Sequence, residues 1–327
     1  MAGTRSVAVA VLLALSIAAC GGAARERSAA PDRIRVAVTV APVADVVRQV
    51  VGDRATVVGL VPDGVDSHTF EPSPATVRTL AGADVLFLNG LHLEESTLAQ
   101  ARAALPQGAP VVPLGDLVLD PSRYAFDFSF PKSKGDPNPH VWMDPTLVRR
   151  WSEIVRDTMS RLDPAGAQLY GANQARFAAV IDDLDRAIAA SVATIPPPAR
   201  KLVTYHDSFA YFSRRYGVPV IAAVQPSDFS EPSPRELQAL VEQIRAERVP
   251  AVFGSEVFPS KVTEEVARES GARFVDDLRD DVLPGRPGDP QHTYAGMLVH
   301  DVVAITAALG GDPAPVRAVP PLPSWSP

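Results

Sequence analysis

The sequence predicts an α/β protein with two lobes, each built on a parallel β-sheet flanked by helices and joined by one long rigid helix. In both halves of the chain, short β-branched runs alternate with amphipathic helical stretches, which is typical of βαβ units around parallel sheets. The longest helical signal lies between these halves. In addition, 327 residues exceed the size at which a single hydrophobic core usually stops growing.

The first half is expected to contribute four strands, at residues 34–40, 56–60, 84–88 and 111–114. The helix after the first strand carries Val43, Val46, Val47 and Val50, and this i, i+3, i+4, i+7 spacing gives one buried stripe. A later helix is expected to begin at Pro145 with Asp144 as its N-cap.

The linking helix is expected over residues 164–195, and three consecutive prolines from Pro196 end it. About 30 residues of helix would extend about 45 Å, enough to brace two lobes. The second half repeats the alternation, with strands at 201–205, 219–224, 251–254 and 273–275. A last helix runs from about Tyr294 to Leu309. The Pro-rich end that follows is expected to be loosely ordered.

The N-terminus predicts export and anchoring. An apolar run over residues 7–19 is too short to span a bilayer but suits the core of a secretory signal, and it ends at Ile17-Ala18-Ala19-Cys20. This end resembles a lipobox, so Cys20 is predicted to be lipidated; the alternative is an ordinary cleaved signal with an incidental cysteine. Because Cys20 is the only cysteine, a disulfide within the chain is excluded.

These boundaries divide the chain into six predicted segments. They are a lipoprotein signal peptide (1–20), a flexible tether (21–33), the first lobe (34–163), the linking helix (164–195), the second lobe (199–311) and a Pro-rich tail (312–327). The formal charge of −7 and the lack of a basic cluster argue against a nucleic-acid partner.

Three histidines recur about 70 residues apart, and each lies in a loop where a strand is expected to give way to a helix. They are His68, His140 and His206. Neutral imidazole is a common ligand for borderline metals such as zinc, and loops on a rigid scaffold carry much of protein function. We therefore predict one metal site assembled from separate loops, although a single loop histidine is more often only a surface or hydrogen-bonded residue.

Several blocks of the sequence resemble the zinc and manganese solute-binding lipoproteins of bacterial ABC importers, known as cluster A-I. The blocks occur in the family's order and cover most of the chain: VTVAP (38–42), VPDGVDSHTFEPSP (61–74), NGL with an acid at Glu94 (89–94), NPHVWMDP (138–145), VTYHDSF (203–209) and YFSRRYG (211–217). The resemblance implies a metal in the cleft between two lobes, held by four side chains.

In the family pattern, three of these ligands map onto His68, His140 and His206, and the fourth is an aspartate late in the second lobe. Two positions compete for that role. Local pattern favours Asp276, whereas the spacing to Gly271 and to Tyr294 favours Asp281, which we predict. Nearby acids, Asp66, Asp144 and Asp207, could hold the second ring nitrogens of the histidines; for Asp144 a capping role is favoured instead.

Three imidazoles and one carboxylate favour Zn²⁺ over Mn²⁺, because manganese prefers more oxygen ligands and a higher coordination number. Relatives that resemble manganese carriers tend to have an acid where this chain has His206. The expected function is therefore capture of Zn²⁺ for an ABC importer, with Mn²⁺ as the alternative cargo.

The resemblance implies a lipid-anchored monomer outside the cytoplasm, on the outer face of the membrane or in the periplasm. Its partners would be a permease transmembrane subunit and the cytoplasmic ATPase. No enzymatic activity is expected. A zinc-dependent hydrolase is the main rival, but the chain has no His-Glu-x-x-His helix, and a fourth protein ligand would close the coordination sphere. A siderophore or corrinoid binder would more often line its site with aromatic residues and arginines.

Three features remain outside the predicted site. The family's long His-rich loop is missing, since residues 116–136 contain no histidine. The aromatic stretch at residues 124–130 is expected to be either a flap over the site or a packed strand. His92, His292 and His300 are expected on the surface, with His92 as a weak auxiliary candidate.

Overall fold

The computed structural model describes residues 33–62, 64–225, 232–255 and 261–324. The described chain forms one compact unit that begins at Arg33. Cys20, the signal segment and all but the last residue of the expected tether lie outside the described residues. No helix within the described ranges is both long and apolar enough to cross a membrane.

Two four-stranded parallel sheets form the centres of two α/β lobes, which confirms the predicted fold class. The first sheet has the order β2-β1-β3-β4 and the second has the order β6-β5-β7-β8. The strands are β1 (Ile34–Val38), β2 (Ala55–Gly59), β3 (Val85–Leu88), β4 (Val111–Pro113), β5 (Leu202–Thr204), β6 (Val220–Ala223), β7 (Ala251–Ser255) and β8 (Arg273–Leu278). All eight lie where the sequence predicts strands.

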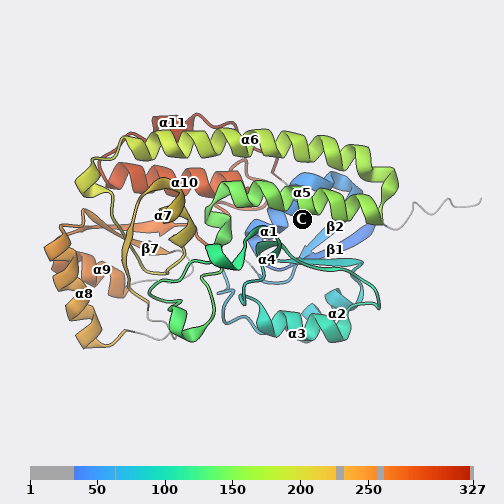
Figure 1. Cartoon of the computed structure of the whole chain (residues 1–327), viewed down its shortest axis with the longest axis horizontal. Helices are drawn as coiled ribbons and strands as arrows, with labels where there is room; N and C mark the ends of the chain where they lie inside the picture. Colours follow the sequence, from blue (N-terminus) through green and yellow to red (C-terminus); the bar gives the residue numbers. More distant parts are fainter. Residues whose placement is uncertain (1–32, 63, 226–231, 256–260, 325–327) are drawn as a thin grey trace, which may run out of the picture. The chain divides into compact units, whose positions relative to one another are not determined.

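Eleven α-helices connect and cover these sheets in the described part of the chain (Figure 1). They are α1 (Ala41–Val51), α2 (Pro74–Ala81), α3 (Glu95–Ala104), α4 (Leu114–Val118), α5 (Pro145–Leu162), α6 (Ala167–Ala193), α7 (Ala210–Tyr216), α8 (Pro234–Glu247), α9 (Lys261–Ser270), α10 (Tyr294–Ala308) and α11 (Ala314–Arg317). As expected, Asp144 caps α5, where its side chain accepts a hydrogen bond from the Thr146 amide.

Helix α6 is the long element between the two sheets. It has 27 residues and follows a short 3₁₀ turn, η5 (Pro164–Gly166), so the predicted start at Pro164 belongs to that turn. It packs against α1 and α5 from the first half and against α10 and α11 from the second half (Figure 1). A continuous hydrophobic cluster includes side chains from both sheets and from α1, α5, α6 and α10. The two halves therefore share one core, which restricts motion between them.

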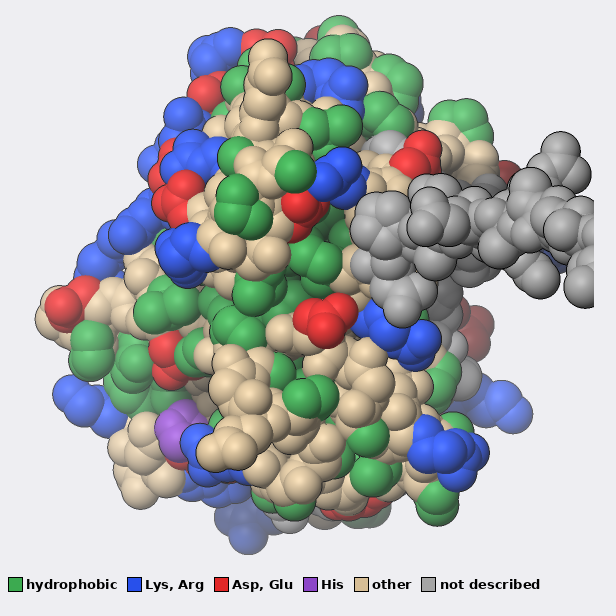
Figure 2. Space-filling model, turned by 90° about the vertical axis from the view of Figure 1, so that its right-hand side faces the viewer, with side chains coloured by type: hydrophobic (Ala, Val, Ile, Leu, Met, Phe, Trp, Pro, Cys, Tyr) green, Lys and Arg blue, Asp and Glu red, His purple; other side chains and the backbone are tan. Residues whose placement is uncertain are grey.

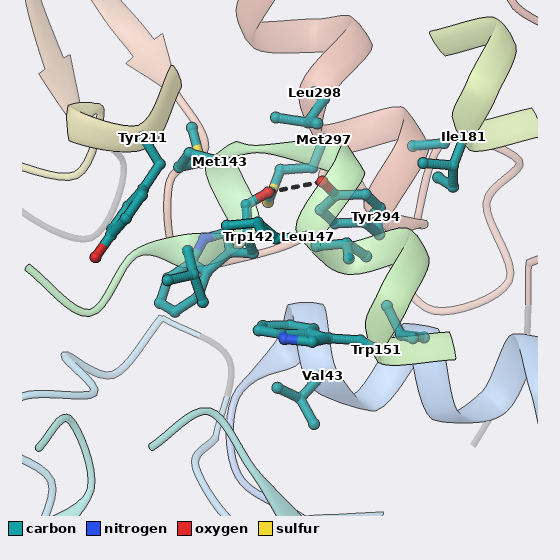
Figure 3. Packing of buried hydrophobic residues seen from close by; sticks show 14 of the residues in the cluster. Val43, Trp142, Met143, Leu147, Trp151, Ile181, Tyr211, Tyr294, Met297 and Leu298 are labelled. Carbon is teal, nitrogen blue, oxygen red and sulfur yellow. Dashed lines mark hydrogen bonds between the residues drawn. The ribbon is translucent and has the colours of Figure 1, made fainter. Parts of the chain in front are cut away.

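The centre of this core is drawn in Figure 3. Trp142 and Trp151 are fully buried, and Tyr294 at the start of α10 donates a hydrogen bond from its hydroxyl to the Trp142 carbonyl oxygen at 2.6 Å. Because this hydrogen bond satisfies the buried Tyr294 hydroxyl, the aromatic ring is buried without an unpaired polar group. The contact joins the first half of the chain, through Trp142, to α10 in the second half.

The Pro-rich end is packed, and our expectation that it is loosely ordered is wrong for residues 312–324. Helix α11 lies against α6, and Val316 and Leu322 are buried in the main core. The Pro323 carbonyl also accepts a hydrogen bond from the side chain of Gln49 in α1. These apolar positions are too few to produce a periodic signal in the sequence, so only packing against α6 reveals them.

Figure 2 shows one face of the molecule. On this face Lys and Arg side chains are scattered among acidic, apolar and uncharged polar groups. A nucleic-acid surface needs basic side chains gathered along one stripe or groove. This face has no such stripe, in line with the net charge of −7.

Candidate metal centre

The structure brings His68, His140 and His206 together. Their Nε2 atoms converge, with separations of 3.2 Å between His68 and His140, 3.3 Å between His68 and His206, and 2.8 Å between His140 and His206. Among the described residues, these three side chains form the one group of three or more His, Cys, Asp or Glu placed closely enough to hold a metal ion. His140 and His206 are fully buried, whereas His68 is half-buried.

The convergence follows from the topology of the two sheets. His68 lies in the loop after β2, and His206 follows β5 two residues beyond its end. His140 immediately precedes the 3₁₀ turn η4 (Val141–Met143), which leads into α5. In parallel α/β sheets, ligands bind outside the carboxyl ends of the strands, where such loops collect.

Two side-chain amides fix the orientation of the buried imidazoles. His140 Nδ1 lies 2.8 Å from Asn138 Oδ1, and His206 Nδ1 lies 2.8 Å from Gln225 Oε1. Because an amide oxygen can only accept, each Nδ1 carries the proton and each Nε2 presents its lone pair to the centre. This arrangement is the one that metal-binding histidines need.

The sequence suggested that carboxylates hold the second ring nitrogens of the histidines. For His140 and His206 that expectation is wrong, because amide oxygens hold them. Asp144 caps α5, and Asp207 accepts a hydrogen bond from the Ser129 amide. Asp66 accepts from the backbone amide of His68, which orders the loop. Gln225 was missed because it follows a different strand, β6, and nothing in its neighbourhood marks it. Asn138 lies in the NPHVWMDP block (138–145), but its role depends on the direction of its side chain, which the sequence does not give.

The electrostatic surroundings favour neutral imidazoles at two of the three positions. Burial lowers the pKa of His68 and of His140 well below the usual histidine range, and the neighbouring His206 lowers both further. His206 differs. Burial alone would lower its pKa, but the charges of Asp280 and Asp281 outweigh that effect and raise it.

Asp281 lies beside the three histidines. Its Oδ1 is 3.9 Å from His140 Nε2, and its side chain is almost fully buried. Neither of its carboxylate oxygens has a hydrogen-bond partner among the described residues. Burial, together with the charge of Asp280, raises its pKa to about 7. A buried carboxylate without a partner is costly, so a cation at this position would stabilise it.

Asp276, the competing position, lies within strand β8 and is exposed. Its pKa is raised by partial burial and by the charges of Asp277 and Glu264, not by any of the three histidines. Since β8 continues to Leu278, the chain reaches the histidines only in the loop that follows, where Asp280 and Asp281 lie.

Asp280 positions that loop. Its two carboxylate oxygens accept hydrogen bonds from the hydroxyls of Ser208 and Ser255, both at 2.8 Å. Its backbone carbonyl accepts a further bond from Trp142 Nε1 at 2.7 Å. Trp142 follows His140 by two residues, and the rings of these residues are in edge contact. The loop that carries Asp281 is therefore tied directly to the turn that carries His140.

The aromatic stretch at residues 124–130 forms no strand in the structure, so the packed-strand alternative is wrong. Phe130 is buried, and its ring centroid lies 5.6 Å from that of His68 and 5.8 Å from that of His140. The stretch is held at Asn138, whose side-chain nitrogen donates to Asp127, and at Tyr211, whose hydroxyl accepts from the Ala125 amide. Phe130 thus provides an apolar wall beside the imidazoles.

The remaining histidines lie outside the cluster, as predicted, but they are not all on the surface. His92 is exposed, and His300 is partly exposed. His292 is buried, with Nδ1 3.3 Å from the Pro284 carbonyl, so our expectation of a surface position for it is wrong. It lies in the turn just before α10, which packs into the core.

Comparisons with known proteins agree with this geometry. The family model described as zinc-uptake complex component A, periplasmic (ZnuA), matches residues 36–308. The manganese-binding lipoprotein MntA of Halalkalibacterium halodurans is 26% identical over 302 residues, with 92% of this chain and 97% of that protein covered. The iron-binding protein YfeA of Yersinia pestis is 25% identical over 280 residues, with 85% and 87% covered.

The zinc-binding protein TroA of Treponema pallidum is 29% identical over 290 residues, with 86% of this chain and 91% of that protein covered. Its solved structure superimposes with a TM-score of 0.76 at 28% identity, and the match covers 85% of this chain and 99% of that one. The names of these relatives specify zinc, manganese and iron, so the comparisons point to a metal without selecting one.

Proposed function

We propose that this chain, which belongs to the ZnuA family of periplasmic zinc-uptake components, binds Zn²⁺ outside the cytoplasm and delivers it to a membrane permease. It is a metal substrate-binding protein of the ABC importer class. The observation that supports zinc as its cargo is the convergence of three imidazole Nε2 atoms beside one unpartnered carboxylate.

The distances between the donors fit the size of zinc. Zinc lies about 2.0–2.1 Å from imidazole nitrogen, so two nitrogen ligands of a tetrahedral ion are separated by about 3.3 Å. The Nε2 pairs here are separated by 3.2, 3.3 and 2.8 Å. Asp281 Oδ1 lies 3.9 Å from His140 Nε2, so its side chain would move toward the three Nε2 atoms to supply the fourth donor. The proposed ligands are therefore His68, His140, His206 and Asp281.

Manganese is the second candidate because a relative that covers nearly the whole chain is named for it. Zn²⁺ stands well above Mn²⁺ in the affinity order of divalent metals at nitrogen and oxygen sites, and one carboxylate among three imidazoles supplies few of the oxygens that manganese prefers. The donor set therefore favours zinc, while metal availability also decides which ion loads in the cell.

This function needs no catalysis. The family consists of substrate-binding proteins of importers, and a fourth protein ligand would leave no open position for a reactive water. We propose a monomer anchored through lipidated Cys20, with residues 34–163 and 199–311 as its lobes and 164–195 as the linking segment. Its partners would be the permease and, through it, the cytoplasmic ATPase.

Zinc affinity should fall steeply below about pH 7. The pKa of Asp281 is about 7, and that of His206 is raised above the usual histidine value by the nearby carboxylates, so at acidic pH protons occupy both positions and must leave before zinc binds. One competing proton weakens binding by about tenfold per pH unit, and two by about a hundredfold. Competition titrations at several pH values between 5 and 8 measure this slope. A flat profile would contradict ligation by these two groups.

The proposed function is tested by titrating the full chain, in detergent, with Zn²⁺ and with Mn²⁺ against a chelating indicator. We expect one tight zinc per chain and manganese binding at least about a hundredfold weaker. Tighter manganese than zinc would establish the alternative cargo. Failure of both ions to bind would rule out zinc and manganese as the cargo.

A further inference from the structure

A tight turn in the aromatic stretch, residues 127–130, lies beside the three histidines. The Asp127 amide donates a hydrogen bond to the Phe130 carbonyl at 3.0 Å, and the Phe130 amide donates one to Asp127 Oδ1 at 3.3 Å. Within the turn, Phe128 is 50% exposed, whereas Ser129 is only 2% exposed. Ser129 is therefore buried in a turn that its own hydrogen bonds close.

Ser129 connects this turn to the second half of the chain at two places. Its amide donates a hydrogen bond to Asp207 Oδ2 at 2.9 Å, and its hydroxyl donates one to the Gln225 backbone carbonyl at 3.1 Å. Both acceptors belong to the surroundings of His206, because Asp207 follows it in the chain and the Gln225 side chain holds its Nδ1. One residue of the first half thus restrains both neighbours of a single proposed ligand.

The same turn also contacts the other two histidines or their supports. The Phe130 ring centroid lies 5.6 Å from that of His68 and 5.8 Å from that of His140. The Asp127 carboxylate accepts a hydrogen bond from Asn138, whose side-chain oxygen holds His140 Nδ1. The three histidines come from three separate loops, so this turn is a point of contact that they share.

We propose that Ser129 is a positioning residue for metal binding, which holds His206 in the orientation that meets the other two histidines and slows release of the ion. Its amide restrains the loop of His206 through Asp207, and its hydroxyl restrains the segment after β6 that carries Gln225. The effect on zinc release rests on the proposed function, whereas the orientation of His206 does not depend on a metal.

Loss of the Ser129 hydroxyl should act on zinc release more than on zinc capture. The hydroxyl joins the two halves of the chain, so a motion that separates His206 from the other histidines must break its bond to Gln225. Changes in an interaction of the bound state appear mainly in the dissociation rate. One hydrogen bond between neutral groups is enough to change a rate about fivefold. Ser129→Ala should therefore release zinc about fivefold faster, with association nearly unchanged.

Two measurements on the full chain in detergent test this role. In the metal-free protein, NMR follows the exchange of the His206 Nδ1 proton with water, which Ser129→Ala should speed about fivefold because Gln225 is held less firmly. In the zinc-loaded protein, stopped-flow transfer to a chelator measures the release rate. Ser152→Ala is the matched control, because Ser152 is also fully buried and its hydroxyl donates to a backbone carbonyl, that of Arg149, within α5.

A double-variant cycle shows whether Ser129 acts through Gln225. Gln225→Leu removes the amide oxygen that holds His206 Nδ1 and keeps a side chain of similar size. Adding Ser129→Ala to this variant should then change zinc release little further, since residues that act through one another are not additive. Two effects that simply multiply would show that Ser129 does not act on His206 through Gln225.

The outcomes separate this role from the proposed function. Equal rates in the Ser129→Ala and Ser152→Ala variants would overturn the positioning role and leave the proposed function intact. A wild-type His206 Nδ1 proton that exchanges as fast as that of free imidazole would do the same, even if Ser129→Ala does not fold. If the wild type binds no zinc while the Nδ1 exchange differs between the two serine variants, zinc as the cargo fails and the positioning of His206 stands.

Discussion

Replacing Asp281 with asparagine should weaken zinc binding by about a hundredfold or more, and Asp276→Asn should leave it unchanged. The Asp281 carboxylate is buried beside His140 and has no hydrogen-bond partner among the described residues, whereas Asp276 is exposed in β8. Mutation of a residue that only supports a ligand costs 10- to 100-fold in metal affinity, so loss of the anionic ligand itself should cost more. A competing chelator measures both variants.

The same Asp281→Asn substitution should raise the stability of the metal-free protein above pH 7. Burial raises the pKa of Asp281 to about 7, so between the unfolded value near 3.8 and about 7 the folded state binds more protons than the unfolded state. Stability therefore falls as the pH rises through this window, and the ionised carboxylate destabilises the apo fold above it. Asparagine removes that charge.

Thermal unfolding of the metal-free protein at pH 8 tests this expected gain in stability. We expect Tm to rise by a few degrees in the Asp281→Asn variant and to stay unchanged in the Asp276→Asn variant. Zinc should then raise Tm strongly in the wild type and little in the Asp281→Asn variant, because stabilisation by a ligand follows its affinity. If Asp276→Asn alone abolished zinc binding, the fourth ligand would be Asp276.

Removing the His206 imidazole should lower zinc affinity by about two orders of magnitude or more. A closed zinc site is worth about 10–16 kcal/mol, so each of four ligands contributes about 3 kcal/mol, or about a hundredfold in the dissociation constant. His206→Ala removes one donor and leaves Gln225 Oε1 without its partner. The His300→Ala variant is the control for loss of a histidine outside the cluster.

His206→Asp is the more informative companion variant. It keeps four ligands but replaces an imidazole nitrogen with a carboxylate oxygen, which suits Mn²⁺ better. We expect the preference for zinc over manganese to shrink by at least about tenfold relative to the wild type. Parallel titrations with the two ions measure that ratio. An unchanged ratio would show that His206 does not set metal selectivity.

The elements of the fold were predictable from local pattern. All eight strands, the capped start of α5 and the long helix between the sheets lie where the sequence places them, since β-branched runs, an Asp-Pro helix start and apolar periodicity are local signals. The packing of the chain's end was not predictable, because its local sequence carries no such signal. The end of the chain carries few apolar positions and many prolines, so nothing nearby marks Val316 or Leu322 as core residues.

The three histidines were predictable because each lies in a loop after or between structural elements, and family blocks surround them. The choice between Asp276 and Asp281 was not settled by the sequence, since both acids lie in one short acidic stretch. Their burial differs because β8 runs on to Leu278 and keeps Asp276 on an exposed strand, while the following loop turns inward to hydrogen-bond with Trp142.

By itself the sequence determined the α/β class, the succession of strands and helices and the three loop histidines that were candidates for one metal site. The class and the elements depend on local periodicity, and the three histidines are marked by their loop positions and by the family blocks around them. Only the tertiary structure decided which groups surround the imidazoles: Asn138 and Gln225 on the ring nitrogens, Phe130 against their faces and Asp281 beside them. Contacts of this kind join residues far apart in the chain, and their side-chain directions are set by packing, which leaves no local signal.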